Sequence, residues 1–325
     1  MSDRRPSAKG VAAAAKRIAP YVTRTPLLPL DREGGRVWIK AECLQQGGSF
    51  KLRGAFNRLL QLSDAERVRG VVAFSSGNHA LGVALAARRL GIAATIVMPA
   101  DAPAVKRDAT LAAGAEIVDY DRATESREAI GARLAAEKGC VLVPSFDDVD
   151  VIEGQGSVGV EVGEQLGRMP DKMVVPCGGG GLSAGIALAL PETEIVTVEP
   201  AGWDDMARSI EAGEPVPVRE PAPPTRCDAL QTKLVSPLTL GALRAAGARG
   251  VAVTEEEIER AMAYAARHLR LVAEPGGAVT LAALLAGKAG VVTERTVVVV
   301  SGGNVDPALY AEILARQAAE AERTG

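Results

Sequence analysis

The sequence predicts an α/β protein with two open, mainly parallel, twisted sheets flanked by helices. Short apolar segments alternate with segments of helical periodicity along most of the 325 residues, which is typical of parallel strands joined by crossover helices. Aromatic residues make up only 3% of the chain, so Ala, Val, Leu and Ile must build the interior, as suits buried strands. The alternation restarts with a helix from Gly154, which indicates a second sheet.

The first half of the chain is expected to contain the following elements. A helix at 11–18 leads into a proline-rich connection through Pro26 and Pro29, and a short apolar segment at 37–39 follows. From Leu52 apolar residues recur at helical spacing, which predicts an amphipathic helix with Ser49 as its N-cap. Strands are then predicted at 71–75, 94–98, 116–120 and 141–143, alternating with helices at 78–90, 104–113 and 125–137.

The second half repeats this alternation with one interruption. Helices are predicted at 154–166 and 182–190, with strands at 173–176 and 195–198. An irregular stretch follows, rich in proline between Pro215 and Pro224. The remaining expected elements are a strand at 251–253, helices at 255–269 and 278–286, a strand at 296–300 and a terminal helix from Pro307.

Composition and charge exclude several classes of function. The net charge is −3, with acidic and basic residues interspersed, so neither nucleic acid nor an anionic membrane is indicated as a partner. No apolar run reaches about 18 residues and the start does not resemble a signal peptide, so we expect a cytoplasmic protein. The four cysteines are far apart and form no CxxC pair, which argues against a disulfide framework or a zinc site.

Lys51 stands in the first turn of the helix that follows the apolar segment at 37–39. A helix N-terminus carries partial positive charge, so it favours the neutral amine over the ammonium, more so where the side chain is buried. A neutral amine forms a Schiff base with an aldehyde. Since an isolated lysine is usually a solvated surface residue, this interpretation depends on the rest of the chain.

Three strand-to-helix junctions, at 75–79, 178–181 and 301–304, are rich in Gly, Ser and Asn. In the first, backbone N–H groups and two serine hydroxyls converge, which favours a cradle for a carboxylate or phosphate, with an ordinary capped turn as the alternative. In the third, the hydroxyl of Ser301 stands at the carboxyl end of a strand, where it could hydrogen-bond a ring nitrogen.

The second junction consists of four consecutive glycines between a strand and a helix. Without side chains, their N–H groups can surround an anion at the helix N-terminus, which favours phosphate binding. A dinucleotide fingerprint is the competing interpretation, because Gly179, Gly181 and Ala184 fit GxGxxA and Glu199 ends the next strand. That interpretation leaves Lys51 and the other two junctions unexplained.

Taken together, these segments resemble the pyridoxal-phosphate enzymes of fold type II, the tryptophan synthase β-like group, and most closely the serine/threonine dehydratase and serine racemase family. The resemblance runs in order through 25–27, 40–42, 48–55, 75–79, 151–156, 178–181, 274–278 and 301–304, which is nearly the whole chain. It implies a homodimer and a small mobile domain at 65–147. Residues 1–64 and 148–325 would form the large domain that binds the cofactor.

The resemblance also assigns roles to residues. Lys51 would carry pyridoxal 5′-phosphate through an imine and act as the base, and Ser76 would be a second acid or base. The implied cofactor-binding residues are Phe50, Lys51, Asn78, Gly178, Gly179, Gly180, Gly181, Leu182, Glu274 and Ser301. The implied substrate-binding residues are Ser75, Ser76, Gly77, Asn78, His79 and Arg127. A divalent cation such as Mg²⁺ would bind the carboxylates of Glu199 and Asp205 and the carbonyl of Trp203. Carboxylates on a short loop suit a hard cation but are as often simply solvated.

The implied activity is β-elimination from a hydroxy amino acid, L-threonine or L-serine, which yields a 2-oxo acid and ammonia. A serine rather than a carboxylate at the pyridine nitrogen favours loss of the hydroxyl. Ser76 leaves amino-acid racemisation open, and 3-hydroxyaspartate is an alternative substrate. An NAD-binding oxidoreductase that uses the glycine-rich loop is the remote alternative.

Overall fold

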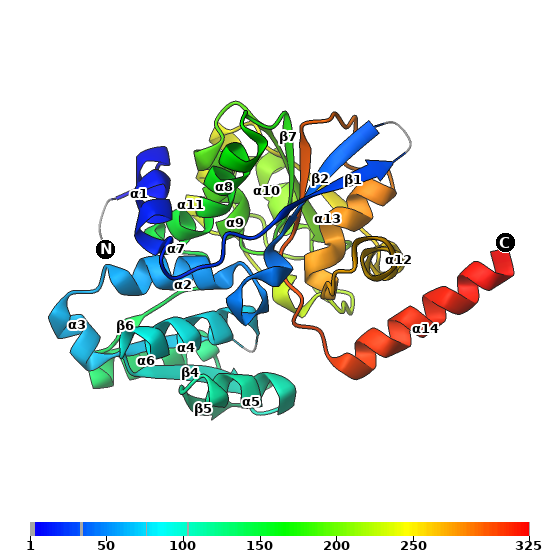
Figure 1. Cartoon of the computed structure of the whole chain (residues 1–325). Helices are drawn as coiled ribbons and strands as arrows, with labels where there is room; N and C mark the ends of the chain where they lie inside the picture. The colour runs from blue at the N-terminus through cyan, green and yellow to red at the C-terminus, as the bar shows by residue number, and fades with distance from the viewer. Residues whose placement is uncertain (1–3, 33–34, 76, 103, 325) are drawn as a thin grey trace.

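The computed structural model describes residues 4–32, 35–75, 77–102 and 104–324, without the side chains at 105, 321 and 324. Two open sheets with covering helices make up the molecule, as Figure 1 shows. The larger sheet has the strand order β1-β2-β10-β7-β8-β9, and the smaller has the order β5-β4-β3-β6. All neighbouring strands pair in parallel except β1 and β2, so the predicted fold class is confirmed.

The larger sheet brings the two ends of the chain together. Its strands are β1 (Leu27–Arg32), β2 (Gly35–Ala41), β7 (Lys172–Pro176), β8 (Glu194–Pro200), β9 (Arg249–Val253) and β10 (Thr296–Val300). β10 runs parallel to β2, with Val300 opposite Ala41, so the segments that follow these two strands leave the sheet at the same edge. Every residue of β10 is buried, as expected for an apolar strand in the middle of a sheet.

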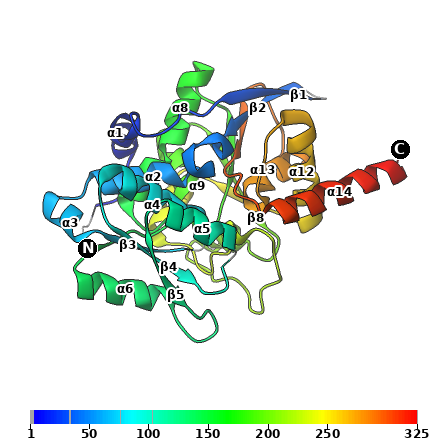
Figure 2. The ribbon, with the colours of Figure 1, turned by 60° about the horizontal axis from the view of Figure 1, so that its bottom comes forward.

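The smaller sheet lies wholly within residues 65–147, the range predicted to form the small domain. Its strands are β3 (Val71–Phe74), β4 (Ala94–Pro99), β5 (Glu116–Tyr120) and β6 (Val141–Leu142). The helices that connect or precede them are α3 (Asp64–Arg69), α4 (Asn78–Leu90), α5 (Ala104–Ala112) and α6 (Arg127–Lys138). Figure 2 shows α4 and α5 on one side of this sheet and α6 on the other. The division into two domains itself stays a prediction.

Most remaining helices pack around the larger sheet. They are α1 (Ala8–Ile18), α2 (Lys51–Leu60), α7 (Val149–Gln155), α8 (Ser157–Leu166), α9 (Gly181–Ala189), α10 (Asp205–Ala212), α11 (Pro237–Ala245), α12 (Glu255–Tyr264), α13 (Pro275–Leu285) and α14 (Pro307–Thr324). Short 3₁₀ turns occur at η1 (Glu42–Leu44), η2 (Gln46–Gly48) and η3 (Asp228–Leu230), and a π-helical turn, η4 (Ala265–Leu269), extends α12. The terminal helix α14 extends away from the body of the molecule in both views (Figures 1 and 2).

Four expectations about these elements were wrong. The connection through Pro26 and Pro29 contains β1, which is an edge strand and therefore tolerates the proline at 29. Ser49 does not cap α2, because the N-cap is Phe50 and no side chain caps it. The helix predicted at 154–166 is broken at Gly156, where the backbone of Gly185 approaches so closely that a Cβ at either glycine would collide. The stretch expected to be irregular contains α10 and α11.

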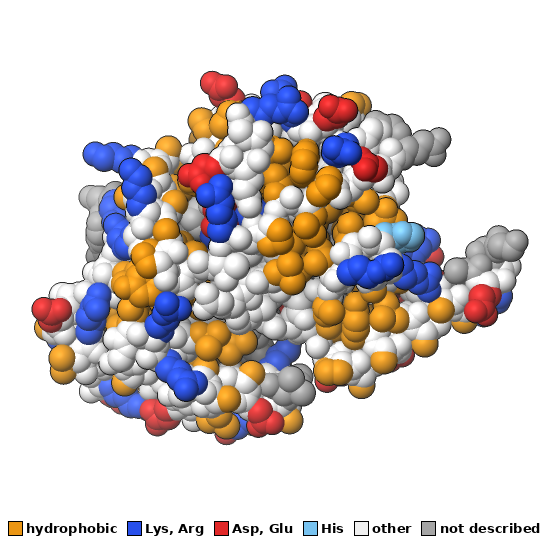
Figure 3. All heavy atoms as spheres, viewed as in Figure 1, with side chains coloured by type: hydrophobic (Ala, Val, Ile, Leu, Met, Phe, Trp, Pro, Cys, Tyr) orange, Lys and Arg blue, Asp and Glu red, His pale blue; other side chains and the backbone are white. Residues whose placement is uncertain are grey.

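The surface of the molecule carries both signs of charge. On the face drawn in Figure 3, Lys and Arg side chains alternate with Asp and Glu, as the net charge of −3 leads one to expect. Across the described residues, no helix combines the length and the apolar character needed to cross a membrane.

Candidate active site

The three Gly-, Ser- and Asn-rich junctions and Lys51 meet at the edge where the parallel strands end. Main-chain bonds join the segment before α2 to the segment after β10: Phe50 N–H donates to Ser301 O at 3.1 Å, and Gly303 N–H donates to Gly48 O at 2.9 Å. The Asn304 amide donates to the carbonyl of Gly47 and to Asn78 Oδ1, both at 2.8 Å. Segments that are far apart in the sequence thus form one continuous wall.

Lys51 is the first residue of α2 and is partly buried. Its Nζ donates to the carbonyl of Ser145 at 3.0 Å, and no carboxylate among the described residues pairs with it. Because nothing compensates the loss of water, burial lowers the pKa of Lys51 from 10.5 to about 8. The ring of Phe50 lies beside the amine, 5.3 Å from Nζ to the ring centroid. Lys51 is therefore suited to act as a nucleophile and base.

Asn78 and Glu274 form a buried pair beside Ser301. Asn78 Nδ2 donates to Glu274 Oε1 at 2.5 Å, and a Cβ at Gly302 would overlap that oxygen. Burial raises the pKa of Glu274 to about 7, with a smaller contribution from Asp228. The Ser301 hydroxyl has no hydrogen-bond partner within the described part of the chain, so it is free to bond a ligand.

The glycine run leads from β7 into α9 and has room for no side chain. A Cβ at Gly179 would overlap the ring of Phe146, and one at Gly180, where φ is +85°, would meet Met206 and Thr239. Gly180 is the N-cap of α9, so no side chain bonds the first-turn N–H groups, among them that of Leu182. Those groups are available to an anion such as a phosphate.

The start of α4, like that of α9, is not capped by a side chain. Its N-cap is Gly77, no side chain caps the helix, and Gly77 N–H donates to the hydroxyl of Ser75 at 3.1 Å. By contrast, α1, α3, α6, α7, α11 and α12 are each capped by their own Ser, Thr or Asp. The helices that begin at this edge are thus left with free N–H groups, which a substrate carboxylate would satisfy. The predicted acid or base Ser76 lies outside the described residues.

His79 is buried, and its ring restricts what it can do for a substrate. Nε2 lies 2.8 Å from the carbonyl of Val143, and a carbonyl only accepts, so Nε2 carries the proton. Burial and the nearby Lys51 lower the pKa of His79 to about 3, which keeps the ring neutral. The buried Nδ1, without a partner, has only a lone pair to offer. The side chain of His79 therefore does not donate to a carboxylate in this arrangement, although its main-chain N–H remains suitable.

Arg127, predicted to close over the substrate, is the first residue of α6. Its guanidinium lies 5.7 Å from the centroid of the Phe74 ring, at the end of β3, and pairs with Glu128 at 2.8 Å. The side chain is 43% exposed. A cation thus stands near the junction at 75–79 without being buried in it.

The predicted cation site contains two carboxyls and no complete ligand set. Glu199 accepts the N–H groups of Met206 at 2.8 Å and Ala207 at 2.9 Å, while both oxygens of buried Asp205 lack hydrogen-bond partners. Burial raises the pKa of Asp205 to about 7, and burial together with Asp205 holds the pKa of Glu199 well above its usual value. Trp203 is buried on the same loop, and its indole N–H donates to Pro223 O. Among the described residues, no group of three or more His, Cys, Asp and Glu side chains could hold a metal ion.

Sequence reasoning missed three contacts at the site. The segment after β6 supplies both the carbonyl of Ser145, which accepts from Lys51, and the Phe146 ring, which packs over Gly179. Lys106 of α5 pairs with Asp228 of η3, and the same turn lies against Gly276, two residues after Glu274, which places the ion pair at the rim of the site. No local pattern signals these contacts, because each joins residues that are distant in the sequence.

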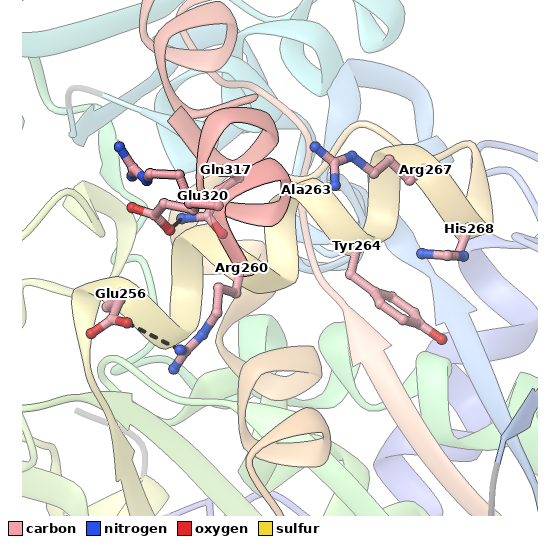
Figure 4. A pocket seen from close by; sticks show the side chains of 9 residues that line it. Glu256, Arg260, Ala263, Tyr264, Arg267, His268, Gln317 and Glu320 are labelled. Atoms are coloured by element: carbon pink, nitrogen blue, oxygen red, sulfur yellow. Dashed lines mark hydrogen bonds and ion pairs between the residues drawn. The ribbon is translucent and has the colours of Figure 1, made fainter. Parts of the chain in front are cut away.

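A second hollow, with a volume of about 510 Å³, lies between α12, η4 and α14. Figure 4 shows the Tyr264 and His268 rings, whose centroids are 4.4 Å apart, and the ion pair between Glu256 and Arg260. None of the residues that line this hollow belongs to the predicted site. The hollow is therefore separate from the edge that carries Lys51.

The residues at the sheet edge fit pyridoxal 5′-phosphate. An amine without a carboxylate partner is available for the aldehyde, uncapped N–H groups for the phosphate and a free hydroxyl for the ring nitrogen. A Cβ at Gly179 or Gly180 would collide with neighbouring side chains, so the loop keeps its main-chain N–H groups uncovered only with glycine at these positions. The fit rests on the donor set and its arrangement around Lys51.

Comparison with known proteins supports this assignment. A family model described as "Pyridoxal-phosphate dependent enzyme" matches residues 18–303. The chain is 41% identical to an L-threo-3-hydroxyaspartate ammonia-lyase of Saccharomyces cerevisiae, over 95% of this chain and 96% of the relative. It is 44% identical to a protein of the same name from a Pseudomonas species, over 94% of this chain and 97% of the relative.

A solved structure gives the same result for the fold. The structure of maize serine racemase aligns with a TM-score of 0.89 and 35% identity, over 98% of this chain and 100% of that chain. The match covers both sheets and the edge at which Lys51, Asn78 and Ser301 meet. This chain therefore belongs to the family of pyridoxal-phosphate dependent enzymes, with fold type II and with ammonia-lyases and racemases among its relatives.

Proposed function

We propose that this chain is an ammonia-lyase that removes water and then ammonia from a 3-hydroxy amino acid. The observation that carries the proposal is the buried amine of Lys51, which pairs with no carboxylate of the described residues. It belongs to the same sheet edge as Ser301 and the two uncapped helix starts. An amine with a pKa of about 8 is near the value that suits a general base at neutral pH.

The reaction follows from these groups. When bound, pyridoxal 5′-phosphate withdraws electrons from the Cα of the amino acid, which makes the Cα proton acidic. Lys51 takes that proton, the C3–O bond breaks, and the protonated Lys51 returns the proton to the leaving hydroxyl, which departs as water. The resulting enamine hydrolyses to a 2-oxo acid and ammonia. The free N–H groups at the start of α4 hold the substrate carboxylate and so fix Cα near Lys51.

As substrate we propose L-threo-3-hydroxyaspartate ahead of L-threonine and L-serine. Its second carboxylate would find the cations Arg127 and Lys106 at the rim of the site, whereas the methyl group of threonine would use neither. Each cation already has one carboxylate partner, Glu128 for Arg127 and Asp228 for Lys106, and the Arg127 side chain is the more exposed of the two cations. The names of the yeast and Pseudomonas relatives support the same order.

A divalent cation at Glu199, Trp203 and Asp205 remains part of the proposal. Burial raises the pKa values of both carboxyls, and Asp205 adds to the rise at Glu199, so a cation between them would stabilise their charged forms. The unpartnered oxygens of Asp205 supply the free ligand atoms that such a cation requires. The homodimer and the cytoplasmic location stay predictions.

The test is a substrate panel on the purified protein. It contains the L-threo and D-threo isomers of 3-hydroxyaspartate and both enantiomers of threonine and serine, and it follows oxo acid, ammonia and substrate chirality. We expect equal amounts of oxo acid and ammonia, with the highest kcat/KM for L-threo-3-hydroxyaspartate. Loss of chirality without oxo acid would instead make the protein a racemase. An arm with chelator, then added Mg²⁺, tests the cation: unchanged turnover after thorough chelation contradicts it.

A further inference from the structure

A buried cluster of charged side chains lies behind α2, on the side away from Lys51. Arg53 is fully buried and stands two residues after Lys51 in the first turn of the helix. Residues two apart on a helix are about 200° apart around its axis, so the two side chains leave α2 in nearly opposite directions. Lys51 meets the wall of the site, and Arg53 enters the interior of the large sheet's helix layer.

Arg53 binds two carboxylates from different elements. Its Nε and Nη2 donate to Glu42 of η1, both at 2.8 Å, and its Nη1 and Nη2 donate to Glu161 of α8 at 2.7 and 2.9 Å. Further bonds run to the Ser157 hydroxyl at 3.2 Å and to the Thr23 carbonyl at 3.3 Å. The planar guanidinium thus makes a bidentate pair, or fork, with each of the two carboxylates at once. A lysine cannot reproduce this geometry.

Lys40 completes the cluster. It is fully buried, donates to Glu161 at 2.6 Å and to the Thr25 carbonyl at 2.8 Å, and so balances the second carboxylate. Two cations and two carboxylates give the cluster no net charge. It therefore joins the segment before β1, the end of β2, the start of α2 and α8 without imposing a net charge on the site.

We propose that Arg53 is a positioning residue for Lys51: by clamping the first turn of α2 to η1 and α8, it sets how deeply the Lys51 amine is held in the wall of the site. No side chain caps α2, and the other bonds at its start are single ones, from Phe50 N–H to the Ser301 carbonyl and from Gly54 N–H to the Gln155 side chain. A buried ion cluster is weak as a source of stability, because apolar residues would often serve as well or better. What the cluster supplies is a fixed direction for one turn of helix, and that turn carries the reacting amine.

The depth of the amine has a measurable signature. Burial is what lowers the pKa of Lys51 to about 8, and no charged group of the cluster contributes to that shift. If the first turn loosens, water reaches the amine and its pKa returns toward 10.5. A change that preserves the charge at position 53 but removes the double fork tests this consequence.

The experiment compares Arg53→Lys with the matched variant Arg58→Lys on the full-length protein. Arg58 lies on the same helix and donates one hydrogen bond to Asp148, with Asp150 3.8 Å away, but its side chain is 18% exposed and makes no bidentate pair. After removal of bound cofactor, the rate at which pyridoxal 5′-phosphate forms an imine with Lys51 is followed by absorbance as a function of pH. We expect midpoints near 8 for the wild type and Arg58→Lys, and a midpoint higher by about one unit or more for Arg53→Lys.

Steady-state kinetics of the enzyme with bound pyridoxal 5′-phosphate give a second test. Misplacement of the base should lower kcat of Arg53→Lys by about 10²-fold with little change in KM. An unchanged midpoint and kcat in a less stable Arg53→Lys would overturn the inference, because Arg53 would then be structural only. If Arg53→Lys does not fold, Glu161→Gln removes one fork with a milder change, and the same shift in midpoint is expected.

The inference rests on the proposed role of Lys51, and the experiment separates the two. If the wild type forms no imine with pyridoxal 5′-phosphate, the proposed function itself is contradicted. If the wild type forms the imine and Arg53→Lys has the same pH midpoint as the wild type, only the positioning role of Arg53 is contradicted.

Discussion

The two faces of α2 each hold a buried cation, but the surroundings shift the pKa values of the two cations in opposite directions. On the face toward the site, Lys51 has a carbonyl and an aromatic ring beside it, and burial lowers its pKa to about 8. On the opposite face, Arg53 has two carboxylates, which raise its pKa although burial alone would lower it. Both residues belong to the same turn of the helix, so neither its dipole nor its amino-acid propensities explain the difference.

The difference lies in which elements the fold brings to each face. η1 and α8 bring Glu42 and Glu161 to Arg53, while the segment after β6 brings only the Ser145 carbonyl to Lys51. A charge with its partners is held in place and unreactive. A charge without them is destabilised and becomes reactive as the neutral amine. One helix turn thus supplies both the anchor and the reactive group.

The largest effect is expected from Lys51→Ala, which removes the reactive amine from one face of α2. We expect no detectable turnover on any 3-hydroxy amino acid and no visible absorbance from covalently bound pyridoxal 5′-phosphate, because the amine that forms the imine and takes the Cα proton is gone. The free energy of unfolding of the cofactor-free protein should not fall by more than about 1 kcal/mol, since Lys51 has no ion pair to lose among the described residues and its removal relieves the cost of a poorly hydrated ammonium. Retained cofactor absorbance in this variant would contradict the role given to Lys51.

The complementary change on the other face is Arg53→Met. It leaves Glu42 and Glu161 without their main partner, and breaking a buried ion pair from one side costs about 3–5 kcal/mol of unfolding free energy. Denaturant unfolding of the cofactor-free protein measures it. Arg58→Met is the control, because its partly exposed pair with Asp148 should contribute about 1 kcal/mol or less. Equal losses in the two variants would mean that burial does not distinguish these arginines.

Much of the fold was predictable because its signals are local. The valine-rich strand β10, the helix α4 and the Gly-, Ser- and Asn-rich junctions are each recognisable from a few neighbouring residues. Parallel topology then places the junctions at one edge, which is why Lys51, Asn78 and Ser301 could be grouped before the structure was known. The edge strand β1, with Pro29 inside it, gave no such signal.

What could not be predicted depends on contacts between distant segments. Phe146 over Gly179, Ser145 beside Lys51 and the break at Gly156 each follow from how two elements pack. Arg53 did carry a faint signal, because it precedes Phe56 by three residues and so lies beside the apolar face of α2. A cation at that position implies buried carboxylates, but the sequence alone does not say that they come from η1 and α8.

The smallest expected effect is a dependence of stability on pH that only the Lys51 face should show. Its pKa is about 8 in the folded protein and 10.5 ordinarily, so above pH 10.5 the amine is neutral in both states and costs nothing. Below pH 8 it is charged in both states, and the folded protein bears the cost of a poorly hydrated ammonium. The stability of the cofactor-free wild type relative to Lys51→Met should therefore rise by roughly 1–2 kcal/mol between pH 8 and 10.5, a partly hydrated amine giving less than the full shift.

Denaturant unfolding of both proteins across that window measures the difference, and groups common to the two cancel. The corresponding difference between the wild type and Arg53→Met should stay flat over the same range, because a guanidinium does not titrate there. A rise for Lys51 beside a flat line for Arg53 would show that the two faces of one helix turn differ in charge compensation and not in burial alone. A flat line for both would mean that the Lys51 amine is hydrated in the folded protein, and the reactivity assigned to it would then need another source.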